Sequence, residues 1–184
     1  WRTKQLQYSY LVALMEAYRP FDAVTREALD YALSYYGIDL PGAELETIAG
    51  AYASLDPFPD TRPALDRLAD TDLELAVLSN GAPHTLESLA AGAGIDGHFS
   101  ALISADEVET FKPAPAVYER AAERLDLPLS ECWLVSSNAW DAAGAATAGM
   151  GVAWVNRAGD PPEQVGEAPS LVVDSLSALA DELA

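Results

Sequence analysis

The sequence has little of several residue types that common classes of functional site require. Its 184 residues include one cysteine, Cys132, and two histidines, His84 and His98. A single cysteine excludes a disulfide scaffold and a multi-cysteine zinc site, and two separated histidines argue against histidine-based metal chemistry. No run of about 18 apolar residues is present, so the sequence predicts no transmembrane helix. Half of the residues are hydrophobic, which is typical of a globular protein.

Basic residues are also scarce. The chain carries 10 lysines and arginines against 29 acidic residues, a net charge of −19, and only Lys4 and Lys112 are lysines. Such a chain repels nucleic acid and anionic membrane surfaces, so neither is expected as a partner. The acids are spread along the chain rather than gathered in a tail. Together with abundant alanine and rare isoleucine, this balance favours a cytoplasmic protein from a high-salt cell; an ordinary acidic protein is the alternative.

The first third of the sequence predicts helices. Leu6, Tyr10, Leu14 and Tyr18 recur at helical spacing. We expect helices over 1–18, 22–36 and 41–55, and a break at 56–60, where two prolines fall. This break divides the chain into a helical domain, residues 1–57, and a second domain, residues 58–184.

The second domain alternates between short apolar strands and helices. This alternation predicts an α/β fold with a parallel sheet covered on both faces. The expected strands are 73–78, 101–104, 132–135, 152–155 and 171–173, and the expected helices are 62–70, 83–92, 114–126, 140–148 and one at the C-terminus.

Ligands of open parallel sheets bind beyond the carboxyl ends of the strands, so the segments that follow the strands are the first places to look for a site. Ser79, Asn80 and Gly81 follow one predicted strand. A hydroxyl, an amide and a flexible backbone are typical of an anion cradle. The same residues are equally typical of a plain turn before a helix.

Lys112 stands between Phe111 and Pro113. The proline keeps the lysine out of a helix, in an extended loop. An ammonium group near a strand end can hold an anionic nucleophile ionised and oriented. A solvated surface charge is the other interpretation.

The segment from Ser136 to Asp141 follows a third strand. Asn138 and Asp141 have the spacing of a helix N-cap and its N3 carboxylate, so a capping box explains the pair without a function. Alternatively, these side chains point into the crevice and orient Lys112 or a water. The two interpretations are compatible. Arg2, on the first helix, is either a surface charge or a clamp for an anion.

Taken together, these motifs resemble the L-2-haloacid dehalogenases of the haloacid dehalogenase superfamily, over essentially the whole chain. The segments that carry the resemblance are Trp1–Leu6, Leu78–Gly81, Lys112-Pro113, Val117–Glu119 and Val135–Asp141.

The resemblance implies a Rossmann-like core with a helical cap inserted after the first strand. In this family an aspartate that ends the first strand attacks the carbon bearing the halogen and displaces halide. Water then hydrolyses the ester, which gives a 2-hydroxy acid of inverted configuration. The implied substrate is a short (S)-2-haloacid, and no cofactor is implied.

The resemblance also implies a role for each matching residue. Arg2 would assist halide departure, and Ser79 with the Asn80 backbone would hold the substrate carboxylate. Lys112 would pair with the nucleophile. The remaining matching residues are Ser136, Asn138 and Asp141, which would orient Lys112 and the hydrolytic water, and Tyr118 and Trp140, which would support the pocket.

Phosphatases of the same superfamily carry a second carboxylate in the last of these loops, because Mg²⁺ needs hard oxygen ligands. Here Ser-Ser-Asn at 136–138 stands where a Gly-Asp pair would be expected, and Asp141 is the only carboxylate of the loop. We therefore expect no metal site and favour dehalogenation. A Mg²⁺-dependent phosphatase with a divergent loop and an inactive, truncated relative that keeps the cap as an interaction surface are the alternatives.

In the family pattern, the nucleophilic aspartate and its strand lie upstream of Trp1. We therefore expect a longer natural protein, with a strand between those that end at Ser79 and Ser136, and we expect residues 1–184 alone to be inactive. The resemblance further implies a homodimer through the cap helices. The aromatic stretch Tyr31–Tyr36 would support it, although core packing explains that stretch as well.

Overall fold

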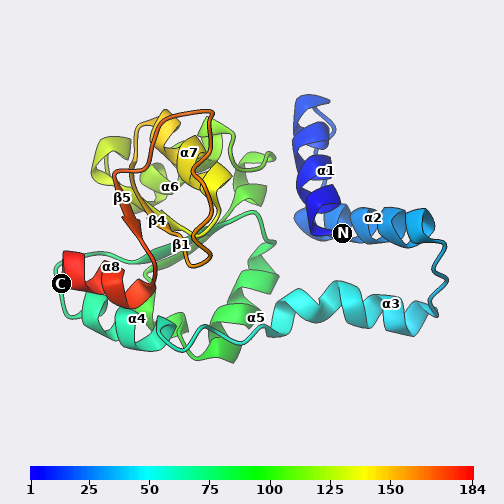
Figure 1. Ribbon diagram of the computed structural model, residues 1–184, viewed down its shortest axis with the longest axis horizontal. Coiled ribbons are helices and arrows are strands. Elements are labelled where there is room, and N and C mark those ends of the chain that lie inside the picture. The colour runs from blue at the N-terminus through cyan, green and yellow to red at the C-terminus, as the bar shows by residue number, and fades with distance from the viewer.

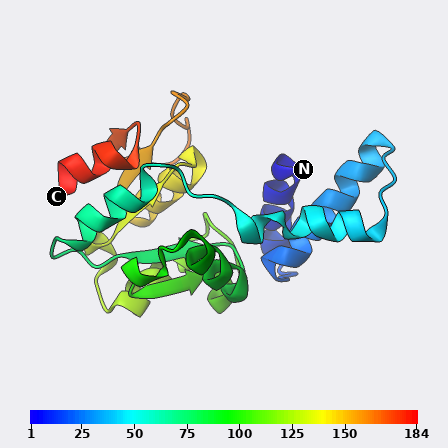
Figure 2. The ribbon, with the colours of Figure 1, turned by 90° about the horizontal axis from the view of Figure 1, so that it is seen from below.

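The computed structural model describes residues 1–184, apart from the side chain of Ala53. Figure 1 shows a group of helices on one side and a mixed group of strands and helices on the other. We call the first group the helical segment (α1 to η1) and the second the α/β core (α4 to α8). In Figure 2, seen from below, an extended stretch of chain after η1 joins the two.

The helical segment contains the three predicted helices, but the first ends at Leu14 rather than at residue 18, so Tyr18 lies in the loop that follows it. The predicted third helix is shorter than expected, because the α-helix ends at Ala49 and a 3₁₀-helix begins at Gly50, a residue of low helix propensity. Gly37 caps the second helix in the left-handed conformation, with φ 65°. The elements are α1 (Arg2–Leu14), α2 (Phe21–Tyr36), α3 (Gly42–Ala49) and η1 (Gly50–Ser54).

The α/β core alternates between strands and helices along the chain. Proline begins α5 and α6, where its missing N–H costs no hydrogen bond. The elements are α4 (Thr61–Ala69), β1 (Ala76–Ser79), α5 (Pro83–Ala93), η2 (Asp96–His98), β2 (Ala101–Ser104), η3 (Ala105–Val108), α6 (Pro115–Leu125), η4 (Leu129–Glu131), β3 (Trp133–Ser136), α7 (Ala139–Ala148), β4 (Gly151–Val155), β5 (Leu171–Val173) and α8 (Leu176–Leu183).

All strand pairs are parallel, and they form two sheets, with the orders β1-β2 and β3-β4-β5. The predicted α/β class with parallel strands is confirmed. The expected additional strand between β1 and β3 stays a prediction. Because the strands are parallel, the ends of β1 and β2 coincide, and Ser79 lies opposite Ser104. The polar residues that follow the strands therefore gather at one edge.

The largest apolar cluster lies between α6, α7 and the three-stranded sheet. Tyr118 is fully buried there, beside Leu134, Val152 and Trp154. The alanine-rich α7 packs on β3 and β4, because small side chains let the helix approach the sheet closely. This packing fixes the start of α7 next to the end of β3.

The chain enters the α/β core at Asp60. Its carboxylate accepts two hydrogen bonds from Arg157 Nη2, at 2.9 and 3.0 Å, and one from the Leu176 N–H at 2.8 Å. Burial alone would raise the pKa of Asp60, but these donors outweigh it and lower the pKa. The start of α4 is thereby tied to the end of β4 and the start of α8.

Candidate active site

Lys112 is buried although it is charged, with 6% of its surface exposed. Its backbone N–H donates to Asn80 Oδ1 at 2.9 Å, which ties its loop to the segment after β1. Its Nζ donates to Asp141 Oδ2 at 3.1 Å. The Lys112–Pro113 peptide bond is cis. A buried ammonium group needs such a partner, since an unpaired charge in the interior is strongly unfavourable. The surface-charge interpretation of Lys112 is therefore wrong.

Asp141 is the centre of the cluster. It lies in the first turn of α7 and is 3% exposed. Besides the Lys112 ammonium, its carboxylate accepts hydrogen bonds from Ser136 Oγ at 2.9 Å and from the Tyr118 hydroxyl at 2.8 Å. The cluster joins the end of β3, the start of α7, α6 and the loop before α6. One charged pair is thus held by two neutral donors, which fixes its geometry.

The protonation state of Tyr118 follows from this arrangement. Burial raises the pKa of Tyr118, and the charge of Asp141 and the hydrogen bond to it raise it further. Tyr118 therefore remains a hydroxyl and donates to Asp141. The pKa of Tyr10, a residue of α1, is also raised, by burial and by the charges of Asp141 and Glu163.

Asn138 is the N-cap of α7, as the sequence predicts, but the capping box is wrong. Its side chain makes no capping hydrogen bond and is exposed. The Asp141 carboxylate turns toward Lys112 instead of back to the cap, because the buried ammonium attracts it more strongly than an N–H does. The Asn138 N–H donates to Ser136 Oγ at 3.2 Å, so the loop closes on the same hydroxyl that serves Asp141.

Ser79 and Asn80 have different surroundings. Ser79 Oγ accepts from the Gly81 N–H at 3.1 Å, which is the geometry of a local turn. The Asn80 side chain is buried and belongs to the cluster through Lys112. The turn interpretation holds for Ser79, and its role toward a substrate carboxylate stays a prediction.

Trp140 contacts the helical segment, whereas Arg2 lies within it. The Trp140 ring packs edge to face against Tyr10 of α1, at 6.0 Å between ring centroids. Arg2 donates to the Tyr52 hydroxyl at 3.1 Å and lies over the Tyr52 ring. At about 1.5 Å per residue, Arg2 is about 12 Å from Tyr10 along the helix axis. The structure thus gathers Lys112 with Asp141 but leaves Arg2 at the edge, bound to its own segment.

Two residues that sequence reasoning missed are Tyr18 and Asp106. The Tyr18 hydroxyl donates to Asp106 Oδ1, across the boundary between the helical segment and the α/β core. Asp106 follows the end of β2, so its place after a predicted strand was a usable signal. Tyr18 carried none, since it reads as one more apolar position of the first helix.

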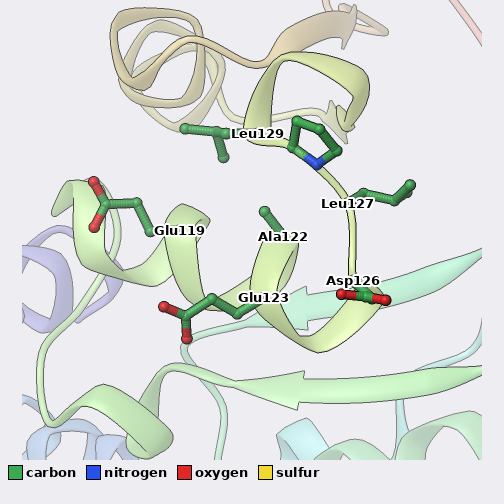
Figure 3. Close-up of a pocket in the computed structure, with 7 residues that line it drawn as sticks. Glu119, Ala122, Glu123, Asp126, Leu127 and Leu129 are labelled. Atoms are coloured by element: carbon green, nitrogen blue, oxygen red, sulfur yellow. The ribbon is translucent and has the colours of Figure 1, made fainter.

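Two cavities lie outside this cluster. One, of about 480 Å³, is open and acidic and lies on α6 and the turn that follows it. Figure 3 shows Glu119, Glu123 and Asp126 around it. The second, of about 250 Å³, lies between α7 and the segment 162–169, with Trp154 and Glu163 at its wall. The lining of the first is Glu119, Ala122, Glu123, Asp126, Leu127, Pro128 and Leu129; that of the second is Ala139, Ala142, Ala143, Trp154, Pro162, Glu163, Gln164, Gly166, Glu167, Ala168 and Pro169.

Among the side chains that the structure describes, no three histidines, cysteines, aspartates or glutamates come together as metal ligands. Within the same part of the chain, no helix has both the length and the apolar character needed to cross a membrane.

The parallel α/β core, with a buried lysine–aspartate pair next to its strand ends, is typical of Rossmann-like enzymes. The chain belongs to the haloacid dehalogenase-like hydrolase family, whose model matches residues 4–149. The family expected from the motifs is thereby confirmed.

Individual relatives and solved structures carry more specific names than the family does. The chain is 42% identical over 183 residues to (S)-2-haloacid dehalogenase 2 of Pseudomonas sp. strain CBS-3, a match that covers 100% of this chain and 80% of that protein. It is 39% identical to the (S)-2-haloacid dehalogenase of Pseudomonas sp. strain YL, with 98% of this chain and 78% of that protein covered. The L-2-haloacid dehalogenase of Xanthobacter autotrophicus, solved with chloropropionic acid covalently bound, matches the structure with a TM-score of 0.92 and 39% identity, over 98% of this chain and 82% of that one.

Proposed function

We propose that the protein is an (S)-2-haloacid dehalogenase that hydrolyses short 2-haloalkanoic acids to 2-hydroxy acids with inversion and without a metal. The observation that carries the proposal is the buried Lys112–Asp141 pair with its donors Ser136 and Tyr118. It stands at the strand ends, in a chain that is 42% identical to an (S)-2-haloacid dehalogenase. A fixed ammonium group there suits a reaction that starts from a carboxylate nucleophile and ends in hydrolysis of its ester.

The reaction has two steps. An aspartate carboxylate attacks C2 of the substrate on the side opposite the halogen and forms an ester bond. The C2–halogen bond breaks, and the halide leaves with the bonding electrons. Water then attacks the carbonyl carbon of the aspartyl ester, and the 2-hydroxy acid, the carboxylate and a proton are released. In the proposal, the attacking aspartate is the one that ends the first strand of the family pattern. Asp141 is unsuited to the attack because its carboxylate already serves Lys112, Ser136 and Tyr118.

The other site residues take the following roles in the proposal. Lys112 pairs with the nucleophile and with Asp141, so its charge favours the ionised carboxylate. The helical segment, residues 1–57, covers the core, residues 58–184, and brings Arg2 to the departing halide. Ser79 and the Asn80 backbone hold the substrate carboxylate; Ser136 and Asn138 with Asp141 orient Lys112 and the hydrolytic water; Tyr118 and Trp140 support the pocket.

The proposal is tested on the natural polypeptide that contains residues 1–184, with EDTA present. Bromide release from the L- and D-forms of 2-bromopropionate is measured by ion chromatography. We expect release from the L-form only, with D-lactate as the product. In a single turnover in ¹⁸O-water, the label should enter the enzyme carboxylate and not the lactate, because water attacks the ester carbonyl.

Two results would overturn the proposal. One is the absence of bromide release from a folded, full-length protein. The other is phosphate release from p-nitrophenyl phosphate that depends strictly on Mg²⁺, which would identify a phosphatase.

We further propose a homodimer formed through the helical segment. Its support is an exposed aromatic patch on α2, where Tyr31 stacks on Tyr35 and Tyr36 is 72% exposed. Light scattering on the chromatographed protein should give the dimer mass, and Tyr35→Glu with Tyr36→Glu should give the monomer mass. A monomeric parent protein would refute this assembly.

We also propose a cytoplasmic location in a halophilic cell. The net charge of −19, which concentrated cytoplasmic salt would screen, supports this proposal. It is tested by the dependence of the melting temperature on KCl.

A further inference from the structure

The helical segment packs against the α/β core next to Lys112. Phe111 comes from the core, yet it is 2% exposed and packs in an apolar cluster with Val12 and Val24 of the helical segment. The rings of Tyr18 and Phe21 lie 5.4 and 5.6 Å from the Phe111 ring, centroid to centroid. The helical segment therefore helps to fix the position of Phe111, which is covalently joined to Lys112.

A polar contact accompanies this apolar one. The Tyr18 hydroxyl, which is half-buried, donates to the Asp106 carboxylate. The Asp106 N–H donates to Ser104 Oγ at 3.1 Å, and Ser104 Oγ donates to the Gly81 carbonyl at 2.7 Å. The hydroxyl of Tyr18 is thus linked by two further hydrogen bonds to the loop after β1.

Both contacts lead to the same pair of loops. The apolar cluster contains Phe111, which precedes Lys112. The chain of hydrogen bonds from Tyr18 reaches Gly81, which follows Asn80. These two loops are themselves joined by the hydrogen bond from the Lys112 N–H to Asn80 Oδ1, at 2.9 Å. The position of the helical segment, which carries Arg2, is therefore coupled to the loops of Lys112 and Asn80.

We propose that Tyr18 is a positioning residue. Its hydrogen bond to Asp106 holds the helical segment in register with the core, so that Arg2 and Lys112 act on the same substrate. This inference rests on the proposed function for its kinetic consequence. Burial and Asp106 raise the pKa of Tyr18, so its hydroxyl stays protonated and keeps donating.

The test variant is Tyr18→Phe, which keeps the ring against Phe111 and removes only the hydroxyl. Bromide and chloride release from L-2-bromopropionate and L-2-chloropropionate are compared in a medium without halide salts. We expect kcat/KM to fall about tenfold, which is the size of one lost hydrogen bond to a charged group. We expect the fall for the chloro acid to exceed that for the bromo acid by about threefold, since chloride is the poorer leaving group and needs Arg2 more.

This ratio separates positioning from simple loss of folded protein. A smaller folded fraction lowers kcat/KM for both substrates by the same factor, because kcat/KM reports the steps up to breakage of the carbon–halogen bond. The second readout needs no activity. The Lys112 amide hydrogen, which donates to Asn80, should exchange faster in Tyr18→Phe than in the parent protein.

Three further variants complete the test. Asp106→Asn keeps a neutral acceptor for Tyr18, which makes a hydrogen bond about half as strong, so its kcat/KM should lie between those of the parent and Tyr18→Phe, whereas Asp106→Leu should match Tyr18→Phe. Combining Tyr18→Phe with Asp106→Leu should cost no more than either change alone, because both remove the same contact. Tyr8→Phe removes a hydroxyl elsewhere in the same apolar cluster and should change neither the halide ratio nor the exchange rate.

The outcomes distinguish this inference from the proposed function. An active parent protein whose halide ratio and Lys112 exchange rate are unchanged in Tyr18→Phe overturns the inference and leaves the function intact. A full-length parent that releases no halide overturns the function, while faster Lys112 exchange in Tyr18→Phe would still support the positioning role.

Discussion

At the scale of single residues, the Lys112–Asp141 pair is the feature with the largest expected effects. Both side chains are almost fully buried, at 7% and 4% exposed. Asp141→Asn removes the charge that balances the Lys112 ammonium in the structure described and leaves only the proposed nucleophile to pair with it. We expect halide release to be lost and the free energy of unfolding to fall by about 3–5 kcal/mol, measured by urea denaturation.

The matched control replaces both members of the pair. Lys112→Met combined with Asp141→Asn removes the unpaired charge as well, so stability should recover in large part while activity stays lost. An Asp141→Asn protein as stable as its parent would contradict the assignment of a buried ion pair.

Tyr118 gives a prediction about alkaline pH. In the folded protein its pKa is raised above the ordinary value near 10. At pH values between the ordinary pKa and the raised one, the folded protein therefore keeps a proton that the unfolded chain loses. The stability that Tyr118 contributes is complete below about pH 10 and declines above it, by up to about 1.4 kcal/mol per pH unit. Tyr118→Phe should lower stability at pH 8 but flatten this decline.

The measurement is the urea midpoint between pH 8 and 11 for parent and variant. Tyr36→Phe is the control, since this exposed ring makes no comparable contact with a carboxylate in the structure described. Parallel curves for parent and Tyr118→Phe would refute a buried, protonated Tyr118.

The sequence identified the members of this cluster but did not show how their side chains contact one another. Lys112, Ser136 and Asp141 could be found because each follows a strand or interrupts a local pattern. Spacing along a helix could not distinguish a capping carboxylate from one turned into the core, since both need Asp141 at the same position. The buried ammonium of Lys112 draws the Asp141 carboxylate into the core instead of to the helix cap. It reaches Asp141 only once the chain has folded.

At the scale of elements, α7 approaches the loop before α6 so closely that only glycine fits at position 144. A methyl group on Gly144 would stand 2.4 Å from Pro113 Cβ and 2.8 Å from the Tyr118 hydroxyl. Gly144→Ala should gain about 1 kcal/mol of helix propensity and lose more through crowding, which typically costs about 1–3 kcal/mol. We expect a lower melting temperature, and lower activity because Pro113 adjoins Lys112.

Gly92 in α5 provides the control. A methyl group there meets nothing within 4 Å, so Gly92→Ala should raise stability by about 0.5–1 kcal/mol and leave activity unchanged. If Gly144→Ala were stabilising to the same degree, the close approach of α7 to Pro113 would be wrong.

Most elements could be predicted from apolar spacing, but their bounds shifted where burial did not follow hydrophobicity. The strand expected at 73–78 begins only at Ala76, and Leu73 is 47% exposed. In β3, Trp133 and Val135 are partly exposed, although the sequence predicts a buried strand. Apolar character marks where a strand can form, whereas its bounds depend on which neighbour it pairs with, here β4.

At the scale of the whole molecule, the sequence did not show which residues of the helical segment and the core contact one another, although Asp106 follows a predicted strand. Tyr10 and Tyr18 read as successive apolar positions of one helix, yet one packs on Trp140 and the other donates to Asp106. Such contacts join residues far apart in the chain, and no local pattern encodes them. They are the contacts on which the relation between Arg2 and Lys112 depends.

The net charge of −19 makes a prediction for the molecule as a whole. Like charges spread over one small surface repel one another and oppose the compact state, and salt reduces that repulsion as the screening length falls from about 10 Å at 0.1 M to about 3 Å at 1 M. The melting temperature should therefore rise steadily between 0.1 and 2 M KCl. Replacing exposed acids with their amides, as in Glu74→Gln, Glu87→Gln and Glu182→Gln, should raise the melting temperature at 0.1 M and reduce its dependence on KCl. Because these side chains are exposed, their replacement changes net charge with little effect on packing. A melting temperature independent of KCl, in parent and variant alike, would show that self-repulsion does not limit this fold and would remove the physical basis for placing the protein in a high-salt cell.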